Sequence, residues 1–401
     1  MKLKRLIEKF NRVWWEYGLI TAMVRTCHFV GDFDGRKLRK YDIRNAKKNK
    51  GDVLFINGCC VEHPTRYRVL HQMEQLEEAG MVCAKVYFED IELEMEKNYQ
   101  LFIFYRCEYT EPIEAFVNKA KNNQKQVCFD IDDLIIDTKY TDQVPFVQAF
   151  PPEYKKVFDT SIMMIGKTLR LCDIAITTTQ DLAMELDKVV SRTYINRNTA
   201  SKEMVACAAN AYKGFKRKQE CIWLGYFSGS LTHNKDLEII RPALMRILEK
   251  YPQVGLILVG ELEESDELIK FKDRIVRRST TNWKELPKLI VQADVNLAPL
   301  EDTVFNRSKS EIKWIEAALV RVPTVASKIG AFAWMIEDGV TGVLCENTED
   351  AWFNELCRIV DDEVFRLRVG EKAYEYVMSK CTTIGNKQEY ADFIQKQMLR
   401  K

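Results

Sequence analysis

The sequence lacks the features that identify several common classes of protein. Its longest apolar runs, such as Val254–Val259, fall far short of the roughly 20 residues that a membrane-spanning helix needs. It has no GxGxxG fingerprint, no pair of CxxC motifs and no HExxH motif. There are only four histidines, and none is spaced from another as metal ligands are: His28, His63, His71 and His233. A transition-metal site is therefore not expected.

The sequence also lacks a pattern of paired cysteines. Its 12 cysteines are scattered, and many lie in apolar, strand-like runs, for example Cys59, Cys83, Cys128, Cys172, Cys221 and Cys345. This distribution favours buried free thiols in a reducing compartment over a disulfide framework. The start of the chain is basic and amphipathic and has no small-residue cleavage site of a secretory signal. We therefore expect a cytoplasmic protein.

Length and charge limit the remaining possibilities. A chain of 401 residues, 46% hydrophobic and 30% charged, is typical of a globular protein with two domains. The formal net charge is only +1, but residues 1–50 contain 14 Lys and Arg against 5 Asp and Glu. One basic end on an otherwise acidic chain indicates a local electrostatic role and not a surface that coats nucleic acid.

The basic end contains one helical pattern. Between Lys2 and Val24, apolar residues recur every three or four positions, and the basic residues lie largely outside that stripe. Such a helix either packs on its own domain or a partner, or lies on an anionic membrane surface. Residues 36–50 are polar, basic and aperiodic, and we interpret them as a linker.

Short apolar runs then alternate with helical stretches in two successive series. Helices between strands imply parallel sheets with right-handed crossovers, so we predict two tandem Rossmann-like, doubly wound α/β domains. The predicted organisation is a basic helix and linker (1–50), a first Rossmann-like domain (51–215), a second Rossmann-like domain (216–380) and a C-terminal helix that can return to the first domain (381–401). Ligands of such sheets bind beyond the carboxyl ends of the strands, which points to a cleft between the domains.

One stretch of the second series has the features of a phosphate site. We predict a helix over Ser310–Leu319, with Ser308, Lys309 and Ser310 at its start and Glu316 two turns inside it. Free amides, the positive end of a helix dipole and a cation suit a diphosphate, and Glu316 could accept hydrogen bonds from ribose. The loop at Ser327–Phe332 would supply further amides. The alternative is an amphipathic helix whose polar residues are only solvated.

The first series carries two less specific candidates. His63-Pro-Thr-Arg66-Tyr-Arg68 follows the first strand, where ligand-binding loops usually lie. Phe129-Asp-Ile-Asp132-Asp133 follows another strand. Asp132 and Asp133 can orient a substrate or fix a loop, can be purely structural, or can be metal ligands, since Mg²⁺ prefers carboxylates.

Residues from Ile222 to about Leu344 resemble the nucleotide-sugar-binding half of retaining glycosyltransferases of the GT-B fold, family four. The shared passages are Glu316-Ala317, Pro323-Thr-Val-Ala326, Gly330, and Gly339-Val-Thr-Gly342-Val-Leu344. Upstream, Tyr226-Phe-Ser-Gly-Ser-Leu-Thr-His-Asn-Lys-Asp236 is similar to the first loop of that domain, with Lys235 at the position of its phosphate-binding basic residue.

The resemblance implies a function and a site. It implies transfer of a sugar from a nucleotide-sugar donor to a glycan or lipid-linked acceptor, with retention and without a metal cofactor, as in bacterial surface-polysaccharide assembly. The domain 51–215 would bind the acceptor, and the domain 216–380 would bind the nucleotide-sugar donor. Lys235, Lys309 and Glu316 would be catalytic. The remaining donor-binding candidates are Ser228, Gly229, His233, Ser308, Ser310, Lys313, Gly330, Ala331 and Phe332, and the acceptor-side candidates are His63, Arg66, Arg68, Asp132 and Asp133. No metal site and no nucleic-acid partner are expected; residues 1–24 could hold the protein at the inner face of an anionic membrane.

The sequence departs from this family at three places. The family has two glutamates eight positions apart, and Ser308 stands where the partner of Glu316 would be. The first loop lacks the family's arginine, and Arg321 replaces a helix-ending glycine. A left-handed residue other than glycine is strained, so we expect a different cap at Arg321. Two alternatives stay open: a non-catalytic module that binds a nucleotide sugar or a partner, and a nucleotide-sugar epimerase with its acid–base pair drawn from Asp132 or Asp133 and Glu316.

Overall fold

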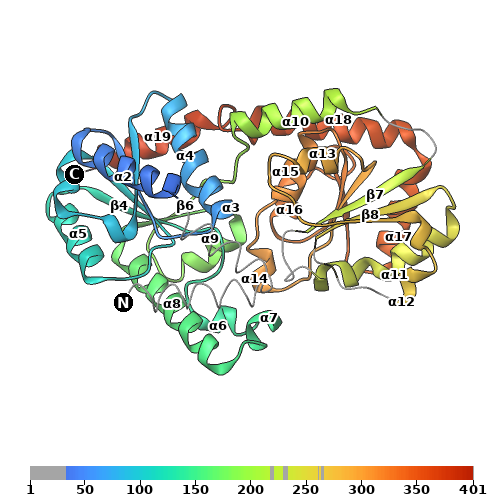
Figure 1. Ribbon diagram of the computed structural model, residues 1–401, viewed down its shortest axis with the longest axis horizontal. Coiled ribbons are helices and arrows are strands. Elements are labelled where there is room, and N and C mark those ends of the chain that lie inside the picture. Colours follow the sequence, from blue (N-terminus) through green and yellow to red (C-terminus); the bar gives the residue numbers. More distant parts are fainter. Residues whose placement is uncertain (1–32, 217–220, 229–233, 261, 263–265, 401) are drawn as a thin grey trace. The chain divides into compact units, whose positions relative to one another are not determined.

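The computed structural model describes residues 33–216, 221–228, 234–260, 262 and 266–400, and these divide into two compact units. The first unit contains the described residues up to Thr177 together with 183–196 and those from Lys387 onward; the second contains 178–182 and 197–386. Each unit is built on a six-stranded parallel sheet with helices around it (Figure 1). The prediction of two doubly wound α/β domains is thereby confirmed.

The sheet of the first unit has the strand order β2-β1-β3-β4-β5-β6. Its strands are β1 (Val53–Asn57), β2 (Cys83–Tyr87), β3 (Leu101–Tyr105), β4 (Gln126–Asp130), β5 (Ile174–Thr177) and β6 (Thr193–Ile195). All five residues of β3 are buried, as expected of a central strand covered on both faces. The order reverses between β1 and β3, so the carboxyl ends of these strands mark the place where a ligand would bind.

The helices of this unit are mostly short near the carboxyl edge of the sheet and longer where they cover a face. They are α2 (Phe33–Lys48), α3 (Glu62–Thr65), α4 (His71–Glu78), α5 (Glu111–Asn122), α6 (Thr138–Thr141), α7 (Pro145–Gln148), α8 (Pro152–Leu171), α9 (Gln180–Leu186), which begins in the second unit, and α19 (Lys387–Met398). A π-helical turn (Arg66–Leu70) joins α3 to α4, and 3₁₀ turns occupy Phe88–Asp90 and Leu93–Asn98.

The interpretation of residues 36–50 as a linker is wrong, because Phe33–Lys48 forms the helix α2. This helix is held mainly by charged side chains. Arg39 donates to Asp90 at 2.9 Å and lies 4.6 Å from the centre of the Tyr87 ring, and Lys47 pairs with Glu92 at 2.7 Å. An anchor made of ion pairs leaves no apolar periodicity in the sequence, and so the helix could not be recognised by that signal.

Helix α19 follows the second unit in the chain but packs in the first. It lies beside α4, as Figure 1 shows. Tyr390 is fully buried and donates its hydroxyl hydrogen to Gln72 of α4. The ring of Phe393 stacks on Tyr194 of β6, with centroids 3.7 Å apart. The core of the first unit therefore includes residues from both ends of the described chain.

The sheet of the second unit has the order β12-β11-β10-β7-β8-β9, again all parallel. Its strands are β7 (Ile222–Phe227), β8 (Val254–Val259), β9 (Ile275–Arg278), β10 (Val295–Ala298), β11 (Thr324–Ser327) and β12 (Val343–Cys345). Its helices are α10 (Lys202–Gly214), α11 (Asn234–Lys250), α12 (Asp266–Ile269), α13 (Leu286–Ile290), α14 (Val304–Arg307), α15 (Ile312–Ala318), α16 (Gly330–Met335), α17 (Glu349–Asp361) and α18 (Glu363–Lys380). The order reverses between β7 and β10.

The expected different cap at Arg321 is wrong: this residue adopts a left-handed conformation, with φ 57°. The amide of Val322 donates to Ala317 O at 3.0 Å and that of Arg321 to Ala318 O at 2.9 Å, which is a Schellman motif without its usual glycine. The Arg321 side chain compensates, because it pairs with Glu371 at 2.8 Å and lies over the ring of Tyr374 at 3.8 Å. These contacts stabilise a backbone that is strained by roughly 1 kcal/mol.

The expectation of buried free thiols holds only in part. The 11 cysteines that the structure describes are all free thiols, but only five of them are buried, and Cys221 is exposed. In the described ranges, no helix is both long and apolar enough to cross a membrane.

Candidate functional site

The carboxyl ends of β7 and β10 carry the first part of the predicted donor site. Ser228 directly follows β7 and is buried, and its amide donates to Val259 O at 2.9 Å. Gly260, with φ 125°, closes this corner, since a Cβ there would lie 2.7 Å from the carbonyl oxygen of Ser228. Across the switch point, the loop after β10 is fixed by Asp236 of α11, which accepts from the amide of Glu301 at 2.9 Å. Two loops thus end at the edge where a ligand is expected.

The segment between α14 and α15 differs from its prediction. Helix α15 begins at Ile312 and not at Ser310, so Glu316 lies about one turn inside it and not two. The amide of Lys309 already donates to Asn306 O at 3.0 Å, which removes it from the free amides expected for a phosphate. The hydroxyl of Ser308 donates to Val304 O at 3.0 Å, and that of Ser310 accepts from Asn198 at 3.0 Å. Tertiary contacts, and not helix propensity, set the shape of this segment.

The structure brings the loop after β11 against the same segment. Gly330 opens α16 with φ 53°, and a Cβ there would lie 2.5 Å from the carbonyl oxygen of Arg307. Only glycine permits this approach without a shift of the backbone. Ala331 and Phe332, also predicted to bind the donor, are buried behind it. Gly330 and Ser308 are therefore neighbours, as the donor-site hypothesis requires.

Lys313 is the electrostatic centre of this region. Its ammonium lies 4.5 Å from the centre of the Tyr226 ring, and within the described residues its Nζ is buried without a hydrogen-bond partner. Burial lowers the pKa of Lys313 to about 8, an effect opposed by Asp236, increased by Lys309 and opposed by Glu316. Lys309 and Lys313 are both positively charged, and Glu316 beside them is half-buried. The two lysines suit an anion, and the carboxylate suits a hydrogen-bond donor on a group attached to that anion.

The other predicted donor residues have more limited support. Lys235 lies in the first turn of α11, next to Asp236, and is exposed. The ammonium of Lys309 lies 5.7 Å from the centre of the Phe305 ring. Gly229 and His233 fall outside the described residues.

Sequence reasoning missed the residues that support this segment from behind. Thr179 donates its hydroxyl hydrogen to Ser308 O at 3.0 Å, and Arg197 pairs with Glu311 at 3.5 Å. Burial raises the pKa of Glu311, partly offset by Arg197. No local pattern identifies these contacts, because the partners are more than 100 positions apart.

In the first unit, Arg106 joins the two predicted aspartates. It follows β3 with φ 46°, and its Nε donates to Asp132 at 2.6 Å, while its Nη2 pairs with Asp133. Tyr105 also donates to Asp132, at 3.0 Å. Burial raises the pKa of Asp132, and Arg106 opposes this effect. Sequence reasoning missed Arg106, although a charged residue at the end of a wholly apolar strand was visible.

The carboxylates of Asp132 and Asp133 thus share one guanidinium that belongs to the fold, which offsets one of their two negative charges. Gly58, after β1, approaches the same turn, since a Cβ there would lie 2.4 Å from Arg106 O. Among the described residues, no group of three or more His, Cys, Asp and Glu side chains is arranged to hold a metal ion. Arg106, Asp132 and Asp133 thus form a fixed polar surface that could orient hydroxyl groups of a ligand.

The three residues predicted after β1 have different positions. Desolvation by its crowded surroundings and the Arg66 cation lower the pKa of His63 to about 4, although its side chain still reaches solvent. Arg66 is buried, with its guanidinium 4.8 Å from the centre of the Tyr67 ring. Arg68 is fully buried in an ion pair with Asp130, so it supports the core and is not available to an acceptor.

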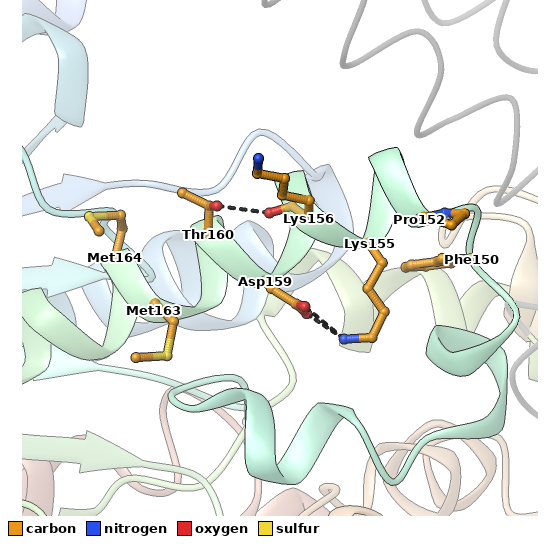
Figure 2. A pocket seen from close by; sticks show the side chains of 8 residues that line it. All are labelled: Phe150, Pro152, Lys155, Lys156, Asp159, Thr160, Met163 and Met164. Carbon is orange, nitrogen blue, oxygen red and sulfur yellow. Dashed lines mark hydrogen bonds and ion pairs between the residues drawn. The ribbon is translucent and has the colours of Figure 1, made fainter.

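A surface hollow of about 670 Å³ lies elsewhere, on α8 of the first unit. Figure 2 shows its lining, with Lys155 paired to Asp159 and the hydroxyl of Thr160 donating to the carbonyl of Lys156. The lining residues are Phe150, Pro152, Lys155, Lys156, Asp159, Thr160, Met163 and Met164. None of the predicted site residues lines it, so this hollow is not part of the candidate donor site.

Comparison with known proteins finds a family similarity within the second unit. Residues 224–362 match the model of the family Glycosyl transferases group 1. This range contains Lys235, Lys309, Lys313, Glu316 and Gly330. No curated protein matches the sequence.

Solved structures extend the similarity to most of the chain. HepE from Anabaena, crystallised with UDP, has a TM-score of 0.58 at 13% identity, with 86% of this chain and 100% of HepE covered. A glycosyltransferase from Rickettsia africae ESF-5 has a TM-score of 0.62 at 11% identity, with 88% and 100% covered. A putative UDP-N-acetylglucosamine 2-epimerase from Listeria monocytogenes has a TM-score of 0.50 at 12% identity, with 86% and 95% covered. The chain has the GT-B fold and is similar to group 1 glycosyltransferases.

Proposed function

We propose that this protein transfers a sugar from a nucleotide-sugar donor to a glycan or lipid-linked acceptor, with retention of configuration and without a metal cofactor. The observation that carries the proposal is the cluster of Lys309, Lys313 and Glu316 at the carboxyl edge of the second sheet, within the range that matches the glycosyltransferase family. Lysine ammonium groups bind phosphate as point charges, and a carboxylate accepts hydrogen bonds from ribose hydroxyls. Together these groups match the two polar parts of a nucleoside diphosphate.

The roles of the residues follow from where charge develops. In a transfer with an oxocarbenium-like transition state, negative charge grows on the leaving β-phosphate. Lys235 and Lys309 would face that charge, and one preorganised group of this kind is worth roughly 3–4 kcal/mol of transition-state stabilisation. On the acceptor side, His63, Asp132 and Asp133 would orient the sugar hydroxyl. The low pKa of His63 keeps its imidazole neutral near pH 7, so that a ring nitrogen can accept a hydrogen bond.

The setting that we propose is the assembly of a bacterial surface polysaccharide in the cytoplasm, at the inner face of the membrane. The basic segment 1–24 would provide attachment to anionic lipid, as described for amphipathic basic helices. HepE is described in complex with UDP and with UDP-glucose, which makes UDP-sugars the first donors to test.

A second function is favoured by one observation. Ser308 replaces the family's second glutamate, and its hydroxyl is engaged within its own turn. A protein that binds a nucleotide sugar without transferring it would tolerate this replacement. Because the epimerase from Listeria shares the fold, an epimerase is a third, less favoured candidate.

One experiment separates the three functions. The purified protein is screened by thermal shift against UDP-, GDP-, ADP- and CMP-sugars, since a ligand at 100 times its Kd adds roughly 2.7 kcal/mol of stability. The stabilising donor, radiolabelled in the sugar, is then incubated with acceptor extracts. Transfer of label, with an unaltered donor pool when acceptor is omitted, supports the transferase. Binding without turnover supports the non-catalytic module, and conversion of the donor alone supports the epimerase.

A further inference from the structure

Lys313 holds a position that the fold itself does not require. It is the second residue of α15, and its ammonium lies over the face of Tyr226, whose ring is fully buried in β7. A cation over an aromatic face gains some stabilisation, but it replaces only part of the hydration that the ammonium loses. Within the residues that the structure describes, Nζ is buried and has no hydrogen-bond acceptor. An ammonium group in such a position destabilises the ligand-free protein.

The charged groups around Lys313 come from α11, from α15 and from the segment before α15, whereas β7 presents the uncharged ring of Tyr226. Asp236 of α11 and Glu316 of α15 favour its charged form, whereas Lys309, from the segment before α15, opposes it. One carboxylate oxygen of Asp236 accepts a hydrogen bond from the amide of Glu301, at 2.9 Å. Two ammonium groups that repel each other, of which the inner one lacks an acceptor among the described residues, indicate an anionic ligand with several acceptor oxygens.

We propose that the diphosphate of the donor is the hydrogen-bond acceptor of Lys313 Nζ, and that Lys313 is the innermost cation of the donor site. This inference rests on the proposed function and adds one specific property to it. Burial lowers the pKa of Lys313 to about 8 in the ligand-free protein, so near pH 8 about half of the molecules carry a neutral amine. A diphosphate beside the amine favours the ammonium form. Binding of the donor is therefore coupled to the uptake of a proton.

The sign of the pH effect follows directly. Below pH 8 the ammonium form is already present, and affinity is insensitive to the titration of Lys313. Above pH 8 a proton must be taken up, and affinity falls by up to about tenfold for each pH unit. The terminal phosphate of UDP ionises near pH 6 and is constant over this range.

The test uses isothermal titration calorimetry of the full chain with UDP at pH 7, 8 and 9, in two buffers of different ionisation enthalpy. For the wild type we expect uptake of about half a proton at pH 8 and weaker binding at pH 9. Lys313→Met keeps an unbranched side chain without charge; it should bind UDP at least tenfold more weakly at pH 7 and lose the proton uptake. Lys288→Met removes an exposed lysine paired with Glu285 and is the matched control.

Thermal unfolding without ligand distinguishes a binding role from a structural one. The melting temperature of Lys313→Met should equal or exceed that of the wild type, because an unpaired buried ammonium is replaced by an apolar group. A structural lysine would instead lower it. Lys313→Arg, which stays charged at every pH tested, should bind UDP without the dependence on pH.

The failures are distinguishable. If the wild type binds none of UDP, GDP, ADP and CDP, the proposed function fails. If it binds one of them with no proton uptake at pH 8, or if Lys313→Met binds as tightly as the wild type, this inference alone is overturned. If Lys313→Met does not fold, the proton uptake of the wild type on binding UDP at pH 8 still tests the inference.

Discussion

Arg68 and Asp130 form a two-point ion pair in the interior of the first unit, with Nε–Oδ1 at 2.8 Å and Nη2–Oδ2 at 2.7 Å. Neither side chain is exposed to solvent. The third nitrogen of Arg68 donates to Asn196 O at 2.7 Å, and Gln72 donates to Asp130 at 2.7 Å. The pair thus connects the π-helical turn with the ends of β4 and β6. A buried pair with all its hydrogen bonds made is sensitive to loss of one partner.

Replacing Arg68 by methionine should destabilise the first unit by about 3–5 kcal/mol, because Asp130 is left as a buried charge. Hydrogen exchange is the appropriate measurement, since the five described tryptophans all lie in the second unit and report on that unit. Protection should fall in β3 and β4 and stay unchanged in β8. Lys97→Met, which breaks an exposed ion pair with Glu94, is the control and should change nothing. Equal protection in the Arg68 variant and the wild type would contradict the role given to this pair.

Arg321→Gly should destabilise the protein less than Arg321→Ala does. Arg321→Ala keeps the strained left-handed backbone and loses the contacts with Glu371 and Tyr374, so it should cost about 1–2 kcal/mol. Arg321→Gly loses the same contacts but removes the strain, and its stability should lie within about 0.5 kcal/mol of the wild type. Urea unfolding followed by tryptophan fluorescence measures both. An alanine variant as stable as the glycine variant would show that the backbone is not strained.

Arg321 also shows where sequence reasoning reaches its limit. Short apolar runs such as Leu101–Tyr105 and Val254–Val259 identify strands, because a central parallel strand is buried on both faces. The cap at Arg321 could not be predicted, because the side chains that compensate for its strain come from Glu371 and Tyr374, 50 or more positions away. Residues 33–48 were misread for a similar reason, since their partners lie on β2 and beyond.

The candidate site was predictable to a similar degree. Motif spacing placed Lys309, Glu316 and Gly330 in one region, and the contact between Gly330 and Arg307 agrees with it. The start of α15 was misplaced by two residues, because Thr179, Asn198 and Arg197 hold the preceding segment. Arg106 was missed because its partners are two aspartates that follow β4, about 26 positions away in the chain.

Glu316→Gln and Lys235→Ala should affect different kinetic parameters. The amide in place of Glu316 weakens a charge-assisted hydrogen bond to ribose, so donor affinity should fall by about 1–2 kcal/mol. Loss of Lys235 removes stabilisation of charge that grows in the transition state, so kcat should fall more than KM rises. Equilibrium binding and steady-state kinetics with the identified donor measure these effects. Donor binding and turnover unchanged in both variants would refute the assignment.

Activity should survive chelation of metal ions. We expect turnover in an excess of EDTA, because the proposed site uses lysines and not a metal ion at the leaving phosphate, and because Arg106 already pairs with Asp132 and Asp133. The measurement is the transfer rate before and after EDTA, with dialysis into metal-free buffer as the control. Loss of activity in EDTA and recovery with Mg²⁺ or Mn²⁺ would instead make the two aspartates metal ligands.

The basic start should bind anionic membranes. Vesicles with phosphatidylglycerol should bind the protein better than neutral vesicles, and added salt should weaken the binding because surface charges are screened. Deletion of residues 1–24 should reduce this binding and leave the thermal unfolding of both units unchanged. Cosedimentation and circular dichroism measure the two effects. If the deletion unfolds the protein, the segment is an internal packing element.

The return of α19 to the first unit has a consequence for synthesis on the ribosome. Tyr390 and Phe393 complete a core whose other members, such as Gln72 and Tyr194, are translated before residue 197. Residues 197–386 must emerge in between, at roughly 5–20 residues per second. The first half of the nascent chain therefore waits on the order of 10 s or longer with the surface for α19 uncovered. During that interval it is a natural client for chaperones that shield apolar surfaces, and the second unit can finish folding before the first.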